Sequence, residues 1–373
     1  MRILYVNDAL AIWGGLERIL IEKANYLADN YGYDICIVTS EQGNHKVPFK
    51  IMPRVKHIDL GINFYKQYRY KGLKRLEICY QLHRKYRSAL KFVISDFCPD
   101  VIVAMRVDLV KDILKLKGHI PLIVESHACC KCSTFEGYGF WRRMLFSWHV
   151  YFATKADVVV SLTESDARDW GRIINNVCVI PNVVNLNPLD YYSSHEAKSV
   201  IFVGRLSKQK DVMILLKIWD VVSNRHPDWI LNIYGEGDEE EHVKAIISQM
   251  DGRVLLHKPT IDIFEKYVNS SLLLLTSLYE PFGLVIPEAM SCGLPVVAFD
   301  CPYGPADIIT DGIDGFVVKK RDVSFFSERV CMLLENKKMR IQMGQAAIAS
   351  SQRYRPNIIM PKWKILFDTI SKK

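Results

Sequence analysis

The sequence predicts an α/β protein made of two doubly wound domains, each with a parallel sheet covered by helices on both faces. Short, fully apolar runs alternate with amphipathic stretches along the chain, a pattern typical of buried parallel strands joined by helices. The alternation stops over residues 183–197, where Pro, Asn and Ser accumulate, and it restarts after residue 198. A chain of 373 residues is also long for a single core, which favours two domains joined by this linker.

The first domain is predicted over residues 1–184. Its expected strands are the apolar runs at 3–6, 34–39, 101–104, 122–125, 158–162 and 177–181. Residues 16–30 are predicted to form a helix because residues at helical spacing fall on one face; they are Leu16, Ile19, Leu20, Lys23 and Leu27. The opening run is cut off by polar residues at 7 and 8, so it is too short for a secretory signal and is expected to be the first strand.

The second domain is predicted over residues 198–354. Its expected strands are the apolar runs at 199–204, 230–235, 253–257, 272–276, 295–299 and 315–318. Residues 355–373 lie beyond its last complete unit and are expected to form a helix that crosses back to the N-terminal domain. We expect the two domains to face each other across a central cleft, with ligands at the carboxyl ends of the strands.

Composition indicates an ordinary globular chain without a membrane-spanning segment. Hydrophobic residues make up 49% of the chain and charged residues 24%. No run approaches 18 uninterrupted apolar residues. Ten cysteines without a secretory signal indicate reduced thiols, so a cytoplasmic location is expected.

The formal net charge of +8 is concentrated in residues 66–91, a predicted helical region with nine Lys or Arg residues against the single acid Glu77. Two interpretations stay open: a solvated helix face, or a surface that meets anionic lipid or an anionic acceptor. The apolar side chains between the charges fit a lipid interface and equally a stripe that faces the core; they are Tyr65, Tyr68, Tyr70, Leu73 and Leu76.

Two loops after predicted strands carry residues suited to anions. In NDALAIWGGLER (7–18), Gly14 and Gly15 let the backbone approach a ligand and leave N–H groups at a helix start, although a tight turn would need them too. In VGRLSKQKD (203–211), Arg205 and Lys210 bracket a helix start, with Lys208 between them. These cations suit a diphosphate, and the alternative is a set of solvent-exposed charges.

The stretch EPFGLVIPEAM (280–290) sets two carboxylates eight residues apart. The apolar run before it is predicted to be a buried strand, and a helix is predicted to start near Val285–Pro287 and to stop by 293–295. Glu280 then lies on the loop and Glu288 in the first helical turn, where its side chain leans back towards the cleft. Two carboxylates that each accept two hydrogen bonds suit the two ends of a nucleotide sugar.

Together these motifs resemble glycosyltransferase family 4, the group 1 family of retaining, nucleotide-sugar-dependent transferases of GT-B fold. The resemblance rests on GGLER, GRLSKQKD, the E-x7-E spacing of EPFGLVIPE, EAMSCGLPVV and GPADIITDGIDGFVV, in that order. It covers almost the whole chain and is densest from 200 to 320. It implies a GT-B fold and a hexosyltransferase activity.

The resemblance also implies a role for each matching residue of the second domain. Arg205 and Lys210 match the pair that neutralises the donor diphosphate, where charge builds during the reaction. Glu288 matches the acid that binds the ribose hydroxyls, and Glu280 matches the acid beside the donor sugar. The other implied donor-binding positions, of which the last three offer backbone N–H groups, are Gly204, Phe282, Gly283 and Leu284.

In the first domain, Gly14 and Gly15 match the family's mobile loop that closes on the phosphates. His127 falls where many members keep a His that contacts the transferred sugar, so it joins Glu280, Arg205 and Lys210 as an expected catalytic residue. Glu164 opens a predicted helix and is a further candidate. The chain departs from the family pattern at the hinge, which reads PNVVN instead of Pro-Asn-Gly-Val-Asp, and after His127, where Ala stands instead of Asp.

No essential metal or other cofactor is expected, because the sequence has no Asp-x-Asp motif or other dense set of Asp and His. The run HACCKC (127–132) suggests zinc, but a second cysteine pair at suitable spacing is missing. The adjacent Cys129 and Cys130 also cannot easily aim at one ion. Thiols that hold no metal are the better account.

The motif FDCPYGPADII (299–309) resembles subfamilies that build bacterial surface polysaccharides from UDP-hexoses. The expected reaction moves a hexose or N-acetylhexosamine from a UDP-sugar to a saccharide acceptor carried on polyprenyl diphosphate. A lipid-linked acceptor would explain the basic segment 66–91 and the aromatic run FWRRMLFSWHVYF (140–152) as peripheral binding to the anionic inner leaflet.

Three alternatives stay open. A transferase with a soluble acceptor would share every donor motif without needing the basic segment. A nucleotide-sugar epimerase of related fold would need catalytic acids but no acceptor site. A nucleic-acid binder would explain the charge but not the E-x7-E site, so no nucleic-acid partner is expected.

Overall fold

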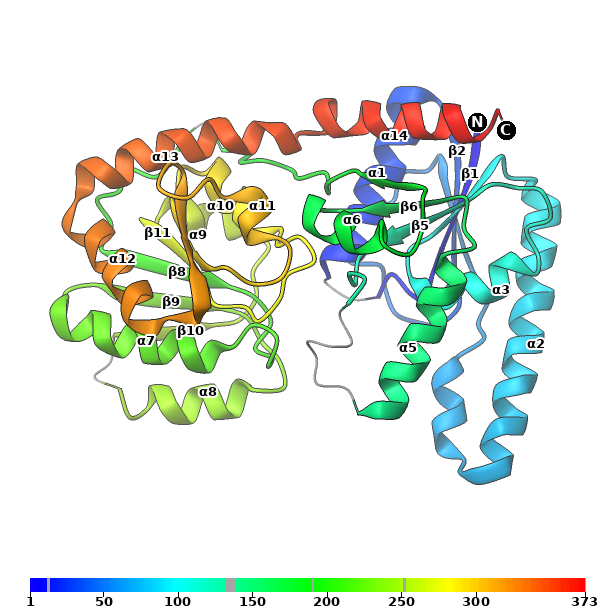
Figure 1. Ribbon diagram of the computed structural model, residues 1–373, viewed down its shortest axis with the longest axis horizontal. Coiled ribbons are helices and arrows are strands. Elements are labelled where there is room, and N and C mark those ends of the chain that lie inside the picture. The colour runs from blue at the N-terminus through cyan, green and yellow to red at the C-terminus, as the bar shows by residue number, and fades with distance from the viewer. Residues whose placement is uncertain (12–13, 132–138, 190, 251–252, 373) are drawn as a thin grey trace. The chain divides into compact units, whose positions relative to one another are not determined.

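The computed structural model describes residues 1–11, 14–131, 139–189, 191–250 and 253–372 (Figure 1). The chain divides into two compact units, Met1–Val183 with Pro356–Lys373, and Val184–Arg355. The last helix, α14 (Pro356–Ile370), therefore belongs to the first unit, as the predicted crossing helix requires. The predicted linker over 183–197 holds no helix or strand among its described residues, and its residue 190 lies outside them.

The first unit contains a parallel sheet of seven strands in the order β3-β2-β1-β4-β5-β6-β7. The strands are β1 (Arg2–Asn7), β2 (Asp34–Thr39), β3 (Val55–Asp59), β4 (Val101–Ala104), β5 (Leu122–Ser126), β6 (Val158–Ser161) and β7 (Val177–Val179). The helices besides α14 are α1 (Gly15–Tyr31), η1 (Phe64–Arg69), α2 (Gly72–Phe97), η2 (Val107–Leu109), α3 (Val110–Leu114), α5 (Phe140–Ala153) and α6 (Glu164–Trp170).

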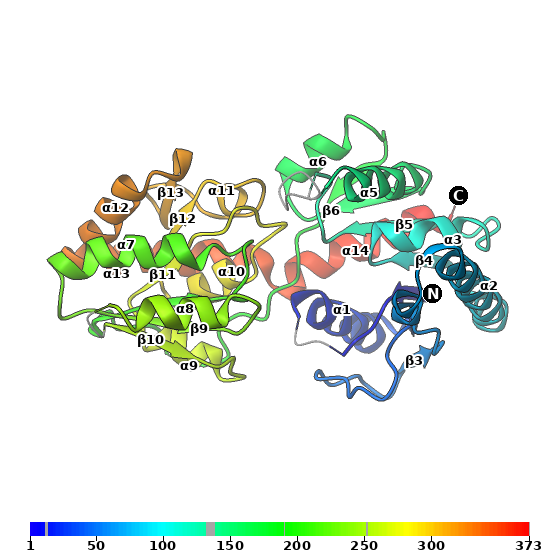
Figure 2. The same ribbon diagram turned by 90° about the horizontal axis from the view of Figure 1, so that it is seen from below.

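Helices cover both faces of this sheet (Figure 2). Successive residues of each strand point to opposite faces, so one strand contributes side chains to both cores. Ile3 and Tyr5 of β1 pack with apolar residues of α1 and α14. Leu4 and Val6 of the same strand enter a second core with residues of α2, α3 and α6. Both faces are apolar, so the strands read as continuous hydrophobic runs in the sequence.

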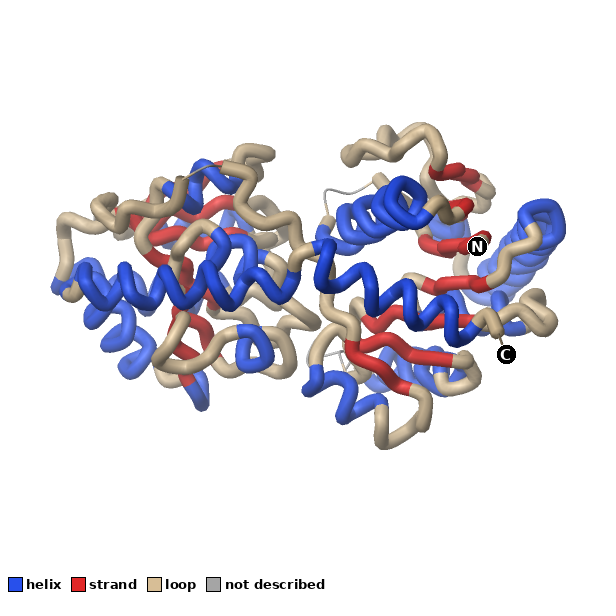
Figure 3. Tube along the Cα trace, turned by 90° about the horizontal axis from the view of Figure 1, so that it is seen from above, coloured by secondary structure: helices blue, strands red, loops and turns tan. Residues whose placement is uncertain are grey.

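The second unit repeats the design with a parallel sheet of six strands in the order β10-β9-β8-β11-β12-β13. In Figure 3 the strands are red and the helices that pack around them are blue. The strands are β8 (Ser199–Val203), β9 (Ile230–Tyr234), β10 (Val254–His257), β11 (Leu272–Leu275), β12 (Val296–Phe299) and β13 (Gly315–Val318). The helices are α7 (Val212–Arg225), α8 (Glu240–Ile247), α9 (Ile263–Val268), α10 (Val285–Ser291), α11 (Pro305–Ile308), η3 (Lys319–Arg321), α12 (Val323–Glu335), α13 (Lys337–Ser351) and η4 (Gln352–Tyr354).

The predicted fold class is confirmed: each unit is a doubly wound parallel α/β domain. Every predicted strand is present, and its ends shift by no more than two residues. The strand that sequence analysis missed is β3, whose sequence VKHID mixes apolar and polar residues. It pairs with β2 at the edge of the sheet and is partly exposed, so it lacks the continuous apolar run of a central strand.

Both sheets reverse their strand order at an equivalent place. In the first unit, β1 lies between β2 and β4, and in the second, β8 lies between β9 and β11. In open parallel sheets, ligands bind outside the carboxyl ends of the strands at such a reversal. The loops after β1 and β4, and those after β8 and β11, are therefore the positions where the topology places functional residues.

Candidate functional site

The strand order of the second sheet brings Lys210 and Glu280 into contact. Lys210 lies on the loop after β8 and Glu280 on the loop after β11, the two strands at the reversal. The Lys210 ammonium forms an ion pair with Glu280 Oε1, and these side chains are 16% and 4% exposed. Ser277 donates a hydrogen bond to the same carboxylate oxygen over 2.5 Å. A cation and a buried carboxylate are thus fixed together at the carboxyl edge of the sheet.

Backbone and side-chain hydrogen bonds tie the two loops to each other. The Leu278 N–H donates to the Gln209 carbonyl over 2.7 Å, and Gln209 Nε2 donates to the Tyr279 carbonyl over 3.1 Å. The Thr276 hydroxyl donates to the Lys210 carbonyl over 3.0 Å. The position of the Lys210 ammonium is therefore set by the protein before any ligand binds.

Arg321 braces this pair of loops, and sequence analysis did not identify it. Its guanidinium donates to Asp211 Oδ2 over 2.6 Å and to the carbonyls of Ser277 and Thr276 over 2.8 and 3.0 Å. Asp211 in turn is the N-cap of α7, where its Oδ1 accepts from the Ile214 N–H over 3.3 Å. Arg321 lies in the run KKRD, which looks like a solvated charge cluster, so the sequence gives no signal of this role.

Arg205 is the second predicted diphosphate ligand, and its side chain is exposed. No described residue is placed to accept a hydrogen bond from its guanidinium, which is therefore available to a ligand. Lys208, between the two predicted cations, is exposed as well. The Gly204 N–H donates to the Tyr234 carbonyl over 3.0 Å, so any role of Gly204 at the donor rests on close backbone approach rather than on its N–H group.

The structure places Glu280 and Glu288 as the sequence predicted. Glu280 is on the loop, and Glu288 lies in the first part of α10, where it is 4% exposed. The Tyr267 hydroxyl donates to Glu288 Oε2 over 3.4 Å. Gly283 between them has a φ of 89°, a left-handed conformation that favours glycine.

The turn between these two carboxylates offers backbone donors. Among the described residues, no acceptor is placed for the backbone N–H groups of Phe282, Gly283 and Leu284. The Phe282 side chain is 3% exposed and packs edge-on against Tyr354, with ring centroids 5.4 Å apart. Its side chain therefore anchors the turn, and three consecutive N–H groups at the start of α10 can donate to an anion or a sugar oxygen.

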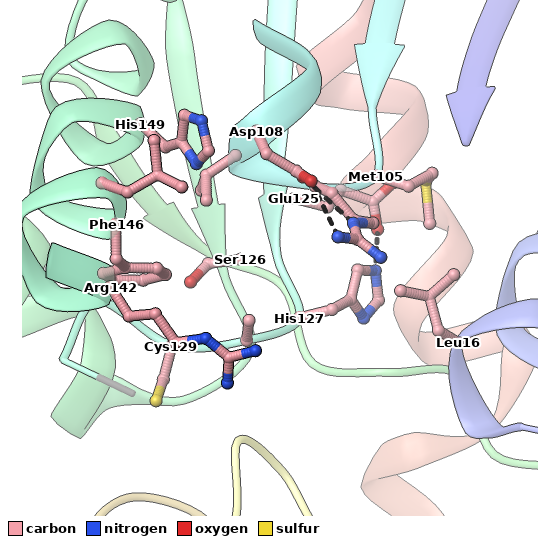
Figure 4. Close-up of a pocket in the computed structure, with 14 residues that line it drawn as sticks. Leu16, Met105, Asp108, Glu125, Ser126, His127, Cys129, Arg142, Phe146 and His149 are labelled. Atoms are coloured by element: carbon pink, nitrogen blue, oxygen red, sulfur yellow. Dashed lines mark hydrogen bonds and ion pairs between the residues drawn. The ribbon is translucent and has the colours of Figure 1, made fainter. Parts of the chain in front are cut away.

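In the first unit, His127 follows β5 and lines a cavity of about 410 Å³ (Figure 4). Its Nε2 lies 3.0 Å from Glu125 Oε2, and its side chain is 8% exposed. The cavity walls come from the ends of β4 and β5 and from helices α1 and α5. They include the apolar side chains of Leu16, Leu145 and Phe146.

Arg106 supplies part of this cavity and links the two strands at the reversal of the first sheet. Its Nη1 forms an ion pair with Asp8 Oδ2 over 2.7 Å. Its Nε and Nη2 donate hydrogen bonds to the two carboxylate oxygens of Asp108 over 3.0 and 2.7 Å. Asp8 follows β1, and Arg106 follows β4. Burial raises the pKa of Asp8 to about 6; Arg106 opposes that rise, whereas Asp108, Glu41 and Glu17 add to it. Of the two carboxylates that Arg106 contacts, Asp108 lines the cavity, and there burial is outweighed by the hydrogen bonds and charge of Arg106, which lower the pKa of its carboxyl. Sequence analysis did not find this cluster.

Helix α5 completes the cavity with Arg142 and His149, which point towards it in Figure 4. Burial lowers the pKa of His149, and the nearby Asp108 opposes that shift. The imidazole is therefore expected to be neutral at pH 7. Together with Phe146, these groups give an apolar surface edged by hydrogen-bonding side chains, the combination that a sugar ring requires.

The remaining predicted positions are only partly described. Gly14 is the N-cap of α1 and Gly15 its first residue, but residues 12–13 of the predicted loop lie outside the described residues. Glu164 begins α6 and is exposed. In HACCKC, Cys129 is buried and Cys130 half-buried, whereas Cys132 lies outside the described residues. Within the part of the chain that the structure describes, no group of three or more His, Cys, Asp or Glu side chains could hold a metal ion.

Exposed aromatic and apolar side chains cluster on two helical segments of the first unit. Along η1 and the start of α2, the exposed fractions of the side chains are 50% for Tyr65, 67% for Tyr68, 41% for Tyr70, 85% for Leu73 and 66% for Leu76. The interpretation of these residues as a core-facing stripe is therefore wrong. Helix α5 exposes Phe140, Trp141, Met144, Leu145, Trp148 and Tyr151. None of the described helices combines the length and apolar character needed to cross a bilayer.

Two family models match consecutive parts of the chain. Residues 13–188 match the model described as Glycosyltransferase Family 4, and residues 191–350 match the model described as Glycosyl transferases group 1. The chain is 29% identical over 362 residues to an uncharacterized glycosyltransferase of Haemophilus influenzae, across 94% of this chain and 95% of that protein. It is 26% identical over 372 residues to the amylovoran biosynthesis glycosyltransferase AmsD of Erwinia amylovora, across 97% and 98%.

Solved structures with a similar fold include two that hold UDP. A mutant of Staphylococcus aureus TarM, in complex with Fondaparinux, alpha-GlcNAc-glycerol and UDP, has a TM-score of 0.80 at 16% identity, across 98% of this chain and 99% of that one. Anabaena HepE in complex with UDP and glucose has a TM-score of 0.77 at 20% identity, across 99% and 100%. At these identities the likeness shows the fold, that of GT-B proteins with two Rossmann-like domains.

Proposed function

Because this chain belongs to the family 4 glycosyltransferases and is a hexosyltransferase, we propose that it moves a hexose or N-acetylhexosamine from a UDP-sugar, with retention of configuration, to a saccharide carried on polyprenyl diphosphate. The product would be a bacterial surface polysaccharide. The observation that carries the proposal is the second unit's strand-end edge, where Lys210 contacts Glu280 beside the α10 turn with its backbone donors.

This edge has the chemistry that a nucleotide diphosphate sugar requires. Lys210 and the exposed Arg205 supply positive charge for the diphosphate. Glu280 and Glu288 are buried carboxylates that accept hydrogen bonds from hydroxyl groups of the sugar and of the ribose. As the bond to the sugar breaks, charge builds on the leaving diphosphate, and fixed cations stabilise that charge without reorganising.

The choice of UDP follows from the similar proteins. TarM and HepE were solved with UDP, and HepE also with glucose. AmsD is named for amylovoran biosynthesis, and another relative is the poly(ribitol-phosphate) alpha-N-acetylglucosaminyltransferase of Staphylococcus aureus, 28% identical over 225 residues. Hexoses and N-acetylhexosamines built into surface polymers are the substrates that best fit this set.

Binding measurements across UDP-, GDP- and ADP-hexoses, with EDTA present, test the donor assignment. We expect one UDP-hexose to bind and to be hydrolysed slowly, because protein groups alone serve the diphosphate and the hydroxyl groups of the sugar and the ribose. Glu288→Ala should weaken binding by about 10–100-fold, since a hydrogen bond to a charged group contributes roughly 1.5–3 kcal/mol. Glu241→Ala, at an exposed position of α8, is the matched control and should bind normally. Binding of none of the nucleotide sugars would contradict the proposal.

The first unit supplies the features that we assign to the acceptor. The cavity beside His127 is large enough for a sugar ring and carries both apolar and hydrogen-bonding groups. In Figure 1, η1, the start of α2 and the start of α5 extend towards the same end of the unit. This end combines exposed aromatic side chains with the basic segment 66–91, as expected for a protein that meets its acceptor at an anionic membrane surface.

Liposome sedimentation at low salt tests the membrane part of the proposal. The protein is expected to bind vesicles containing anionic lipid and to dissociate as salt is added. Lys71→Ala/Lys85→Ala should weaken binding by about 30-fold, because each basic residue near the surface contributes roughly 1 kcal/mol. Lys217→Ala/Lys338→Ala, which neutralises two exposed lysines of the second unit, should bind like the unaltered protein. If none of the three proteins bound anionic vesicles, a soluble acceptor would be favoured instead.

A further inference from the structure

Helix α1 buries a lysine that the donor and acceptor sites do not use. The Lys23 side chain is 1% exposed and lies in the core between the sheet and helices α1 and α14. A buried ammonium is costly unless it is paired, so its partners indicate why it is kept.

Three groups from different elements enclose the Lys23 ammonium. It forms an ion pair with Glu125 Oε1 at the end of β5, and the Glu125 side chain is also 1% exposed. The ammonium lies 4.0 Å from the ring centroid of Trp363 on α14 and 5.2 Å from that of Tyr5 on β1. One carboxylate and two aromatic faces thus replace the water that the charge loses on burial.

The second oxygen of Glu125 contacts His127. Nε2 of the imidazole lies 3.0 Å from Glu125 Oε2. Burial by itself would raise the pKa of Glu125, but the charge of Lys23 and the hydrogen bonds from His127 and Lys23 together hold it below its usual range. An ionised carboxylate only accepts hydrogen bonds, so Nε2 of His127 must carry the hydrogen in this contact. In the neutral ring, the lone pair then belongs to Nδ1.

We propose that Lys23 and Glu125 are positioning residues, which fix the tautomer and orientation of His127 so that its Nδ1 accepts a hydrogen bond from a hydroxyl of the bound sugar. This inference rests on the proposed function, in which the cavity beside His127 holds a saccharide. Figure 4 shows the imidazole at the cavity wall, between Glu125 and Leu16. Glu125 acts only through His127, and Lys23 acts only through Glu125.

The lysine is necessary because of the burial of Glu125. Without a cation, a carboxyl group in this core would take up a proton, and a protonated carboxyl donates a hydrogen bond as well as accepting one. The tautomer of His127 would then no longer be fixed. Trp363 closes the cluster from the C-terminal helix, so α14 contributes to the site although none of its residues lines the cavity.

Two charge-free variants separate this role from simple packing. Lys23→Met/Glu125→Gln and Lys23→Met/Glu125→Leu both remove the buried charges and keep similar volumes. The Gln carbonyl can still accept from Nε2–H of His127, whereas Leu cannot. The imidazole ¹⁵N chemical shifts of His127, assigned by their loss in His127→Ala, report the tautomer directly. UDP release from UDP-glucose and UDP-N-acetylglucosamine reports kcat and KM.

We expect the Nε2–H tautomer in the unaltered protein and in the Gln variant. The Leu variant should lose this signature and should turn over about 100-fold more slowly than the Gln variant, with KM changed by less than about threefold, because a misplaced catalytic group costs about that much. In a His127→Ala background the two variants should have equal kcat values.

Other results would overturn the inference. An Nδ1–H imidazole in the unaltered protein would do so without any variant, and therefore even if both variants failed to fold. Equal spectra and equal kcat values for the Gln and Leu variants would reduce the pair to a packing role. If the unaltered protein released no UDP from either nucleotide sugar, the proposed function would fail, whereas the imidazole spectra would still decide the tautomer.

Discussion

Lys210→Ala is expected to lower the turnover of the proposed UDP-sugar donor by about 10²–10³-fold, equivalent to roughly 3–4 kcal/mol of transition-state stabilisation. The ammonium is held by Glu280, and its loop is tied to the loop after β11 by hydrogen bonds through Gln209 and Thr276. A charge that is fixed in advance stabilises the leaving diphosphate without reorganising during the reaction. The effect should therefore appear in kcat measured at saturating donor.

Arg205→Ala should lower kcat by a similar factor while leaving the fold unchanged, because no described residue depends on its exposed guanidinium. Lys217→Ala is the matched control, since this exposed lysine lies on α7 rather than on the loop that carries the predicted cations. Its kcat should stay within about threefold of the unaltered value, as expected for a surface charge. Thermal melts of all three variants separate lost chemistry from lost stability. Near-normal turnover in both Arg205→Ala and Lys210→Ala would remove the assignment of the diphosphate site.

The parts of this site that sequence analysis predicted are those with local signals. Fully apolar runs mark buried parallel strands, and the loops that follow them are functional positions in a doubly wound sheet. Glu280 and Glu288 were placed on a loop and on a helix because Pro, Gly and the apolar strand before them are all within a few residues. The contact between Lys210 and Glu280 depends on the order of the strands in the sheet. The alternating pattern of the chain predicts a parallel sheet but does not give that order.

The parts that could not be predicted depend on contacts across long stretches of chain. Arg321 meets Asp211 from 110 residues away, and its neighbours in sequence are lysines that look solvated. Lys23 was placed on the repeating face of α1, but its partner Glu125 is 102 residues distant. The periodicity of a helix shows which face is buried, whereas it cannot show which carboxylate meets a lysine on that face.

Lys23→Met is expected to lower the free energy of unfolding by about 3–5 kcal/mol, because it leaves the Glu125 carboxylate buried without its cation. Met has a similar length, so the change removes the charge rather than the packing. Lys91→Met, at an exposed position of α2, is the control and should change stability by less than about 0.5 kcal/mol. Urea unfolding of the three proteins measures the difference.

The pH dependence of this loss identifies its cause. In the unaltered protein burial would raise the pKa of Glu125, but Lys23 and His127 outweigh that effect and hold the pKa low. The stabilising contribution of the carboxylate is therefore present above its pKa in the unfolded chain and is lost as pH falls through its pKa in the folded protein. In Lys23→Met the buried carboxyl should instead bind a proton more tightly than in the unfolded chain, so the stability of that variant falls as pH rises. The deficit should therefore be larger at pH 8 than at pH 5, and Lys23→Met/Glu125→Gln should recover most of it at pH 8. A deficit below about 1 kcal/mol that is equal at both pH values would contradict a buried ion pair at this position.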